Sequence, residues 1–311
     1  MAVSKPILLV ALGGNALIRK GQHGTIPEQL ENLRVPLRQI ARLAEAYRII
    51  ITHGNGPQVG NLLLQQECCS EVPRLPLEIL VAQTQGQIGY MIESTLDSEL
   101  MSLGVDKEHY IVSVLSYVVV NEDDPAFLSP SKPIGPAFNE AEAARLPYPT
   151  VRTDKGYRRV VASPKPVTIV EKREIKRLID LGFIVISCGG GGIPVIRDSR
   201  TFHGVDAVID KDLASARLAG EIGVDIFLIA TDVESVALHY EQETRRSWLR
   251  SLSVGDAGRF LEEGHFPPGS MGPKVEACVE FMKHGGTRAV IASIERIEAA
   301  VQGTAGTEFA P

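Results

Sequence analysis

Three lysines of this 311-residue chain stand in settings that differ from those of an ordinary surface lysine. Lys132 lies in SKPIGPAF, where prolines and a glycine constrain the backbone. Lys211 in VIDKDLASA and Lys274 in GSMGPKVEA each lie at the expected start of a helix. A cation at that end of a helix opposes the helix dipole, and a bound anion would compensate it. The pattern favours an anion site, although each lysine taken singly is equally consistent with a solvated turn.

Three glycine-rich loops follow short apolar runs. They are ALGGNAL (residues 11–17), THGNGPQVG (52–60) and the four glycines at 189–192. Glycine lets the backbone approach a ligand closely and aim its N–H groups at it. The second loop leads into a helical pattern over residues 59–67, whose N-terminus favours a negative charge. The loops and the lysines therefore predict the same kind of ligand.

These loops are expected to meet at one edge of a sheet. Ligands of open α/β sheets bind at the carboxyl ends of the strands, so the loops after Leu12, Thr52, Cys188 and Ala230 should gather there. Glycine loops with two or three lysines are suited to phosphoryl transfer, because that chemistry depends on positioning and charge neutralisation.

Two aspartates flank Lys211 and have different expected tasks. Asp210 is the expected cap of a helix over residues 213–222, since a short carboxylate can accept from the first N–H groups. Asp212 would hold the lysine ammonium groups through charge-assisted hydrogen bonds. The alternative for Asp212 is a second helix-capping carboxylate.

Other chemistries find little support. The chain has no G-x-x-x-x-G-K-[ST] motif, and GGNA lacks the third glycine of a dinucleotide fingerprint. His53 lies in the second glycine loop, where it would either touch substrate or orient the loop. The histidines at 109, 203, 239, 265 and 284 show no metal-ligand spacing, and Cys188 has no base positioned beside it in the sequence. We therefore assign no metal ligand and no cysteine nucleophile.

Apolar runs alternate with helical periodicity, which predicts a mainly parallel sheet covered on both faces. The expected strands are residues 7–12, 48–52, 110–120, 183–188, 225–230 and 288–292. Helical periodicity follows at 30–44, with Pro36 expected to kink that helix, at 79–103 as one or two helices, and around 175–179 and 275–282. Pro273 is expected to open the last of these.

Residues 121–166 interrupt the alternation. The segment is rich in proline and has little helical period. Structureless loops longer than about 15 residues are uncommon in compact domains. We therefore predict a small protruding subdomain or lid, with an ordered surface loop as the alternative.

Composition limits the classes of protein to consider. The length allows one large α/β domain or two smaller ones, and a net charge of −6 argues against nucleic acid as a partner. Cys68, Cys69, Cys188 and Cys278 form no C-x-x-C pair, so we expect reduced, mostly buried thiols. No apolar run reaches the roughly 18 residues of a membrane span, and no targeting segment is apparent. We expect a soluble, cytoplasmic protein without a membrane partner.

Taken in order, motifs from the whole chain resemble those of the carbamate kinases, a branch of the amino-acid kinase superfamily. They are ALGGNAL, THGNGPQVG, AQTQGQIGYM (82–91), NEDDPAF (121–127), KPIGP (132–136), GYRRVVASPKP (156–166), CGGGGIPV (188–195), GVDAVIDKDLAS (204–215), TDV (231–233), GHFPPGSMGPKVEA (264–277) and GTAGT (303–307). The resemblance implies one domain over residues 1–311, with the 121–166 subdomain inserted within it. It further implies an open three-layer αβα sandwich with a mainly parallel sheet of about eight strands.

The resemblance also implies an activity. Carbamate kinases transfer a phosphoryl group reversibly between carbamoyl phosphate and ADP, with Mg²⁺, to give ATP and carbamate, and they usually form homodimers. Carbamate breaks down to ammonia and carbon dioxide, so ATP synthesis is the usual direction. The pathway that supplies carbamoyl phosphate, arginine metabolism or another, is left open.

Site residues carry over by motif. The resemblance implies that Lys132, Lys211 and Lys274 act on the phosphoryl group and that Asp212 organises them. The residues that would cradle carbamate and the moving phosphoryl group are Gly13, Gly14, Asn15, Gly54 and Asn55. Those that would bind nucleotide are Gly190, Gly191, Asp210, Thr231, Asp232, Met271 and Lys274.

One position separates this branch from its relatives. Many members of the superfamily have a lysine two residues before the first glycine pair, where this chain has Ala11. In carbamate kinases the lysine of the protruding subdomain takes over that work, and Lys132 fits the replacement. The resemblance is therefore to carbamate kinases more than to acetylglutamate, aspartate or glutamate kinases.

Two departures from the family pattern concern the nucleotide. The family often has an aromatic residue shortly after TDV, where this chain has Ala237, and residues 240–252 are rich in arginine (Arg245, Arg246 and Arg250). Both lie where the nucleotide base is expected. The alternatives that stay open are a kinase of another small carboxylic or carbamic acid and a non-catalytic metabolite-binding homologue.

Overall fold

Apolar segments form the centre of an eight-stranded sheet. The computed structural model describes residues 5–153, 156–240, 244–267 and 269–311. Within them the strand order is β15-β17-β16-β12-β1-β2-β9-β3. The bounds are β1 Ile7–Leu12, β2 Arg48–His53, β3 Tyr110–Ser113, β9 Phe183–Ile186, β12 Ile226–Thr231, β15 Ser251–Ser253, β16 Arg288–Ser293 and β17 Thr307–Ala310. The six strands from β16 to β3 are parallel to one another, and β17 is antiparallel to β16.

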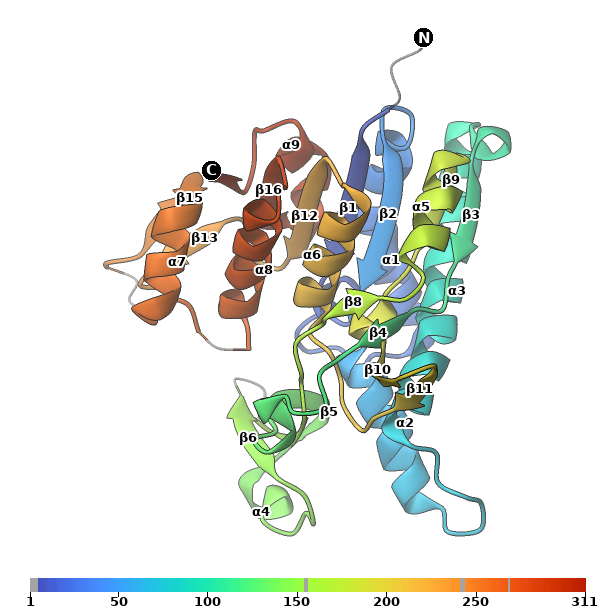
Figure 1. Cartoon of the computed structure of the whole chain (residues 1–311), viewed down its shortest axis with the longest axis vertical. Helices are drawn as coiled ribbons and strands as arrows, with labels where there is room; N and C mark the ends of the chain where they lie inside the picture. The colour runs from blue at the N-terminus through green and yellow to red at the C-terminus, as the bar shows by residue number, and fades with distance from the viewer. Residues whose placement is uncertain (1–4, 154–155, 241–243, 268) are drawn as a thin grey trace.

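Helices cover both faces of this sheet (Figure 1). On one face lie α1 Ile26–Leu43, α3 Leu77–Leu103 and α9 Ile297–Val301, which share a buried cluster with Leu8, Val10 and Leu12 of β1. On the other face lie α5 Lys172–Asp180, α6 Lys211–Ile222, α7 Val254–Glu262 and α8 Met271–Lys283, packed with Leu9 and Ala11. Alternate residues of one strand thus enter opposite layers, as a three-layer αβα sandwich requires.

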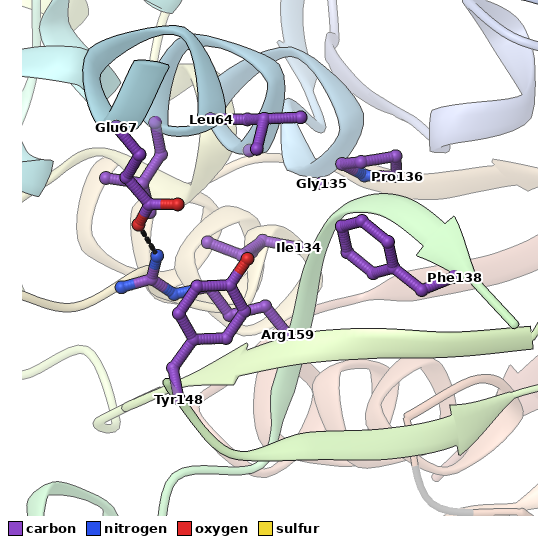
Figure 2. A pocket seen from close by; sticks show the side chains of 10 residues that line it. Leu64, Glu67, Ile134, Gly135, Pro136, Phe138, Tyr148 and Arg159 are labelled. Atoms are coloured by element: carbon purple, nitrogen blue, oxygen red, sulfur yellow. Dashed lines mark hydrogen bonds and ion pairs between the residues drawn. The ribbon is translucent and has the colours of Figure 1, made fainter. Parts of the chain in front are cut away.

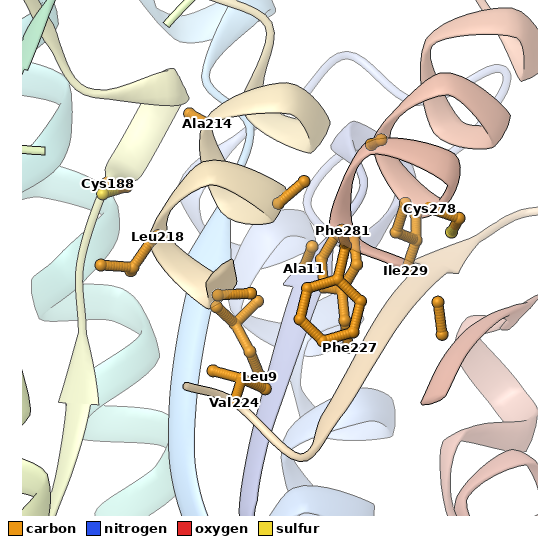
Figure 3. Packing of buried hydrophobic residues seen from close by; sticks show 14 of the residues in the cluster. Leu9, Ala11, Cys188, Ala214, Leu218, Val224, Phe227, Ile229, Cys278 and Phe281 are labelled. Carbon is orange, nitrogen blue, oxygen red and sulfur yellow. The ribbon is translucent and has the colours of Figure 1, made fainter. Parts of the chain in front are cut away.

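The second layer contains an aromatic contact beneath the site described below. Phe227 of β12 and Phe281 of α8 meet edge-to-face with ring centroids 5.5 Å apart (Figure 3). Such a pair contributes about 0.5–1.5 kcal/mol beyond the area it buries. It ties α8, which carries Lys274, to the centre of the sheet.

The predicted strands at 7–12, 48–52, 183–188, 225–230 and 288–292 are confirmed to within two residues at each end. The predicted strand over 110–120 is wrong, because the chain leaves the large sheet after β3. It continues as β4 Tyr117–Val119 in a second sheet of order β11-β10-β4-β8, where β8 is Thr168–Ile169, β10 Ile193–Asp198 and β11 Thr201–Gly204. At the break, the backbone N–H of Ser116 donates to Gln85 Oε1, and its carbonyl accepts both from Gln85 and from the N–H of Ile193 in β10.

Of the two alternatives for the region 79–103, the single helix is confirmed as α3. One helix prediction is wrong: α8 begins at Met271, so Pro273 is its third residue and does not open it. Helix α1 continues through Pro36. Helix α2, Gly56–Cys68, follows the second glycine loop and has Pro57 in its first turn, where no intrahelical N–H bond is lost.

Within residues 121–166, β5 Lys132–Phe138, β6 Thr150–Thr153 and β7 Gly156–Val161 form an antiparallel sheet of order β5-β7-β6. Helix α4, Glu140–Ala143, connects β5 to β6, and this sheet lies at the lower end of the view, apart from the large sheet (Figure 1). The strands β13 Val236–Leu238 and β14 Ser247–Leu249 form a further pair. Short 3₁₀ helices are η1 Gly14–Ala16, η2 Asp106–Glu108, η3 Pro125–Phe127, η4 Gly189–Gly191 and η5 Ile294–Arg296.

The cysteines correct one expectation. Cys188 and Cys278 are buried, but Cys68 and Cys69 at the end of α2 are exposed, because that end of the helix projects from the sandwich. All four are free thiols. Across the described ranges, no helix combines the length and the apolar character needed to cross a membrane.

Candidate active site

The first two glycine loops meet at the carboxyl edge of the large sheet, as predicted. The N–H of Gly13 donates to the carbonyl of Ala230 at 2.9 Å, and the N–H of Gly54 donates to the carbonyl of Leu12 at 3.2 Å. A Cβ atom built on Gly54 would lie 3.7 Å from Gly14 N and 3.9 Å from Lys211 Cδ. Gly14 is exposed and a Cβ there would meet nothing within 4 Å, so this backbone borders open space. Asn15 beside it is half-buried in η1.

The third glycine loop packs against the second. A Cβ on Gly189 would lie 2.4 Å from His53 Nε2, and one on Gly190 would lie 2.1 Å from Asn55 Nδ2. Gly190 also has a positive φ of 66°, a backbone conformation that favours glycine. Gly191 lies against the carbonyl of Ile209, the residue before Asp210. Gly190 and Gly191 therefore pack closely against Asn55 and against the residue that leads into α6.

Asp210 caps α6, as predicted. Its Oδ1 accepts from the backbone N–H of Asp212 at 2.8 Å and of Leu213 at 3.4 Å. Its Oδ2 accepts from the ammonium group of Lys132, which comes from the first residue of β5. One carboxylate thus joins the helix terminus to the segment 121–166.

Asp212 lies between the other two lysines. Its Oδ1 accepts from Lys211 Nζ, and its Oδ2 accepts from Lys274 Nζ at 2.9 Å. Lys211 Nζ also lies 3.5 Å from the carbonyl oxygen of Ala11 at the end of β1. Asp212 is 3% exposed and Lys211 is 8% exposed. The structure therefore brings the three predicted lysines and both aspartates into one cluster.

The pKa values within this cluster follow from burial opposed by the neighbouring charges. Burial alone would raise the pKa of Asp212, but Lys211 and Lys274 outweigh it and hold that pKa well below its usual range. Burial would likewise raise the pKa of Asp210, but the positive charge of Lys132 outweighs burial, so this pKa is lowered. Burial lowers the pKa of Lys211 despite the attraction of Asp212, whereas Asp212 keeps the pKa of Lys274 raised against burial. Both carboxylates are therefore ionised at neutral pH.

Thr231, Asp232 and Met271 lie around the same edge. Thr231 ends β12, is buried, and donates from Oγ1 to Asp232 Oδ1 at 3.1 Å. Asp232 is exposed, and its charge raises the pKa of Lys274. Met271 begins α8 and packs on the buried cluster around Ala11.

The sequence analysis assigned no role to Thr84 and Gln85, two buried polar residues that hold these loops in place. Thr84 Oγ1 accepts from Asn55 Nδ2 at 2.9 Å. The amide of Gln85 bonds to both backbone groups of Ser116 and donates to the carbonyl of Gly189 at 3.1 Å. The signal was present in AQTQGQIGYM, where this polar pair stands in a segment of helical periodicity.

In the segment after TDV, the aromatic side chains are Tyr240 and Trp248, and Arg246 lies near both rings. Ala237 is buried in β13, and its cross-strand partner in β14 is Trp248. The guanidinium of Arg246 lies 4.7 Å from the ring centroid of Tyr240 and 5.8 Å from that of Trp248. Residues 241–243 of the arginine-rich segment, and Pro268 of GHFPPGSMGPKVEA, lie outside the described residues.

Cys188 and His53 are both buried and uncharged. Burial raises the pKa of the Cys188 thiol to about 12, which fits the absence of a nucleophile assignment. Burial lowers the pKa of His53 to about 4, and His53 Nδ1 lies 3.1 Å from the carbonyl oxygen of Gly54. This geometry favours the interpretation in which His53 orients the loop.

The lowered pKa of His53 predicts a pH dependence of stability. An unfolded histidine has a pKa of about 6.5, so below that pH the unfolded chain takes up a proton that the folded chain refuses until about pH 4. We expect this residue alone to reduce the free energy of unfolding by about 2 kcal/mol between pH 7 and pH 5. Urea unfolding of wild type and His53→Gln at both pH values measures it. Equal pH slopes for the two proteins would contradict this prediction.

Comparisons with known proteins agree with this fold. A sequence model of the amino acid kinase family matches residues 6–293. The chain therefore belongs to the amino acid kinase family.

Within that family the likeness is to carbamate kinases. The carbamate kinase of Pyrococcus horikoshii is 45% identical over 313 residues, which cover 98% of this chain and 99% of that protein. The structure of carbamate kinase from Giardia lamblia bound to citric acid aligns with a TM-score of 0.92 at 34% identity over 98% of both chains. The same Giardia enzyme bound to AMP-PNP aligns with a TM-score of 0.88 at 35% identity over 98% of both chains. By this homology the chain is a phosphotransferase of the carbamate kinase group.

Proposed function

We propose that the enzyme transfers a phosphoryl group reversibly between carbamoyl phosphate and ADP, with Mg²⁺, to give ATP and carbamate. The observation that carries this proposal is the cluster of Lys132, Lys211 and Lys274 around Asp210 and Asp212. Ammonium groups already held by buried carboxylates would neutralise a phosphoryl group in transit with little reorganisation. Because carbamate decomposes to ammonia and carbon dioxide, we propose ATP synthesis as the usual direction.

In this reaction a β-phosphate oxygen of ADP attacks the phosphorus of carbamoyl phosphate, and carbamate leaves with the electrons of the broken P–O bond. Gly13, Gly14, Asn15, Gly54 and Asn55 would surround carbamate and the moving group. Since the N–H groups of Gly13 and Gly54 already donate to strand carbonyls, these two glycines would provide close approach, not donors. Lys132 and Lys211 would neutralise the charge on the phosphoryl oxygens.

For the nucleotide we propose Gly190, Gly191, Asp210, Thr231, Asp232, Met271 and Lys274. The Giardia lamblia carbamate kinase bound to AMP-PNP supports a nucleotide site in this fold. Lys274 would neutralise the ADP phosphates, with Asp212 fixing its ammonium group. Gly190 and Gly191, which are buried against Asn55 and Ile209, would act by shaping the floor of the site.

Mg²⁺ fits this site as a companion of the nucleotide. The ion prefers oxygen ligands and is usually held by one or two carboxylates together with substrate phosphates. The oxygens of Asp210 and Asp212 are bonded to ammonium and N–H groups, and the described part of the chain holds no cluster of three metal-ligating side chains. The phosphates would therefore supply most ligands, with the exposed Asp232 beside Lys274 as the protein carboxylate. When bound, the ion would offset phosphate charge.

We also propose that residues 121–166 act as a lid inserted in a single domain over residues 1–311. The segment has its own antiparallel sheet, and it delivers Lys132 to Asp210 at the edge of the large sheet. A lid that contributes a charged group would couple closure to completion of the site.

A homodimer is supported by one face of the molecule. Strand β3 is an edge strand of the large sheet, and Tyr110 on it is 62% exposed. On α3, which packs beside β3, Tyr90 is 70% and Met101 is 62% exposed. Large apolar side chains beside an open sheet edge are typical of an interface.

We also place the enzyme in the cytoplasm, where ADP and carbamoyl phosphate are metabolites.

The test is ATP formation from carbamoyl phosphate and ADP, with Mg²⁺ and with EDTA. We expect rapid ATP synthesis that EDTA abolishes. ATP synthesis unaffected by EDTA would contradict the proposed Mg²⁺ dependence. Folded protein that binds ADP but forms no ATP would favour the non-catalytic homologue. Phosphorylation of acetate, aspartate or glutamate by ATP, without activity on carbamoyl phosphate, would favour the other kinases.

A further inference from the structure

Helix α2 connects the substrate loop to the strand that carries Lys132. The helix begins after Asn55 and packs along β5, whose first residue is Lys132. Gly60 and Gly135 meet at this junction, and a Cβ on Gly60 would lie 1.9 Å from Gly135 N. Gly135 has a φ of 71°, which also favours glycine. Because the two backbones touch, no larger residue fits at position 60 without moving β5.

Buried apolar side chains surround this contact. Val59 of α2 and Ile134 of β5 are fully buried and belong to one cluster with Val161 of β7 and with Leu80 and Val81 of α3. Ile134 is two residues from Lys132 along the strand. The position of the Lys132 backbone is thus set by how β5 seats on α2.

A polar clamp lies farther along the same helix (Figure 2). Glu67, near the end of α2, forms an ion pair with Arg159 of β7, and the Arg159 guanidinium lies 4.1 Å from the ring centroid of Tyr148. Arg159 pairs across the strands with Ile134, so the clamp acts on the strand next to β5. The Glu67 and Arg159 side chains are 27% and 25% exposed. Their attraction is therefore less screened than that of a fully exposed pair.

We propose that Glu67 and Arg159, with the Gly60–Gly135 contact, are positioning residues for phosphoryl transfer. They hold β5 and β7 against α2, so that Lys132 reaches the cluster at Asp210 in register with Asn55. This inference rests on the proposed role of Lys132. A merely structural role would affect stability. The proposed role affects kcat, because the clamp acts through the position of the Lys132 ammonium group.

Single variants separate turnover from binding and stability. Glu67→Gln and Arg159→Gln are expected to lower kcat about tenfold, or about 1.4 kcal/mol in the barrier. We expect KM for ADP to stay within about twofold and Tm within about 3 °C, because a partly exposed ion pair contributes little to folding. Arg159→Lys keeps the charge but loses the planar group that lies on Tyr148, and should retain more activity than Arg159→Gln. The control is Glu298→Gln on α9. The Glu298 side chain is 28% exposed, close to the value for Glu67, and it forms an ion pair with Arg42.

The decisive measurement adds Glu67→Gln to Lys132→Ala. If Glu67 acts through Lys132, the second change lowers the residual kcat less than about twofold. A further tenfold loss, or an equal loss in Glu298→Gln, would overturn the proposal. Full activity of Glu67→Gln with an inactive Lys132→Ala would overturn this inference alone. Full activity of Lys132→Ala would overturn both this inference and the proposed role of Lys132.

Gly60→Ala tests the backbone contact independently of charge. The added Cβ would collide with Gly135 and push β5 away from α2. We expect kcat to fall more than in Glu67→Gln, with KM for ADP again nearly unchanged. The matched control is Gly86→Ala on α3, where a Cβ would meet nothing within 4 Å. A folded Gly60→Ala protein with wild-type kcat would contradict the proposal.

Discussion

Replacement of Lys132 by alanine is expected to lower turnover about a thousandfold while the chain stays folded. Removing one preorganised charge that stabilises a transition state costs about two to three orders of magnitude, and more in phosphoryl transfer. The Lys132 side chain is 26% exposed, so its loss costs little packing. Asp210 loses one partner but keeps its two backbone N–H donors. We therefore expect a stability loss of only about 1–2 kcal/mol.

The measurement is ATP formation at saturating ADP and carbamoyl phosphate, with circular dichroism to check the fold. Lys165→Ala is the matched control, because Lys165 also lies in the segment 121–166 and pairs with Glu276 but is 74% exposed. It should retain wild-type turnover. A Lys132→Ala enzyme within threefold of wild type would show that Lys132 does not act on the phosphoryl group.

Asp212→Asn is expected to cost both stability and activity. The substitution keeps the shape but leaves two buried ammonium groups, those of Lys211 and Lys274, without the carboxylate between them. Breaking a buried ion pair by removing one partner costs about 3–5 kcal/mol. The pKa of Lys211, which burial already lowers, should fall further because Asp212 is the main group that raises it. Without Asp212 to fix them, the ammonium groups of Lys211 and Lys274 would also be less well placed on the phosphoryl group and on ADP.

Urea unfolding and ADP titration measure the two effects of Asp212→Asn. We expect a lower urea midpoint with an unchanged slope, and weaker ADP binding. The folded pKa of Asp212 is lowered, so its stabilising effect is complete above the ordinary carboxyl pKa of about 3.9 and is lost as the pH falls below it. The difference from wild type should therefore be constant from pH 5 to pH 7. Asp180→Asn, an exposed carboxylate on α5, serves as control, and a loss no larger than in this control would contradict the prediction.

The central strands could be predicted because each is a continuous buried apolar run, a local property that the sequence displays directly. The capping role of Asp210 was equally local, since cap and helix are adjacent. The meeting of Lys211 and Lys274 followed from loops and helix starts that share one edge of the sheet, whereas the approach of Lys132 was implied only by the resemblance to carbamate kinases. The central strands and the cap were predictable because residues adjacent in the sequence determine them.

The features that escaped prediction depend on residues far apart in the chain. The run 110–120 divides at Ser116, whose backbone groups bond to Gln85 of α3 and to Ile193 of β10. Lys132 bonds to Asp210, 78 positions away, whereas reasoning from sequence gave the lysines to Asp212. The contact between Gly60 and Gly135 is likewise invisible in either local pattern. Short strands such as β15, at the edge, and β17 beside it were missed because three or four residues show no clear period.

The bond between Lys132 and Asp210 has a consequence for affinity. An ammonium group has three N–H donors, so Lys132 can keep its bond to Asp210 and still donate to a phosphoryl oxygen. Its positive charge is already partly offset by the Asp210 carboxylate, so a ligand gains less affinity from it than from an unpaired lysine. The same offset makes release of the product easier. An enzyme built in this way favours rapid turnover over retention of its ligands.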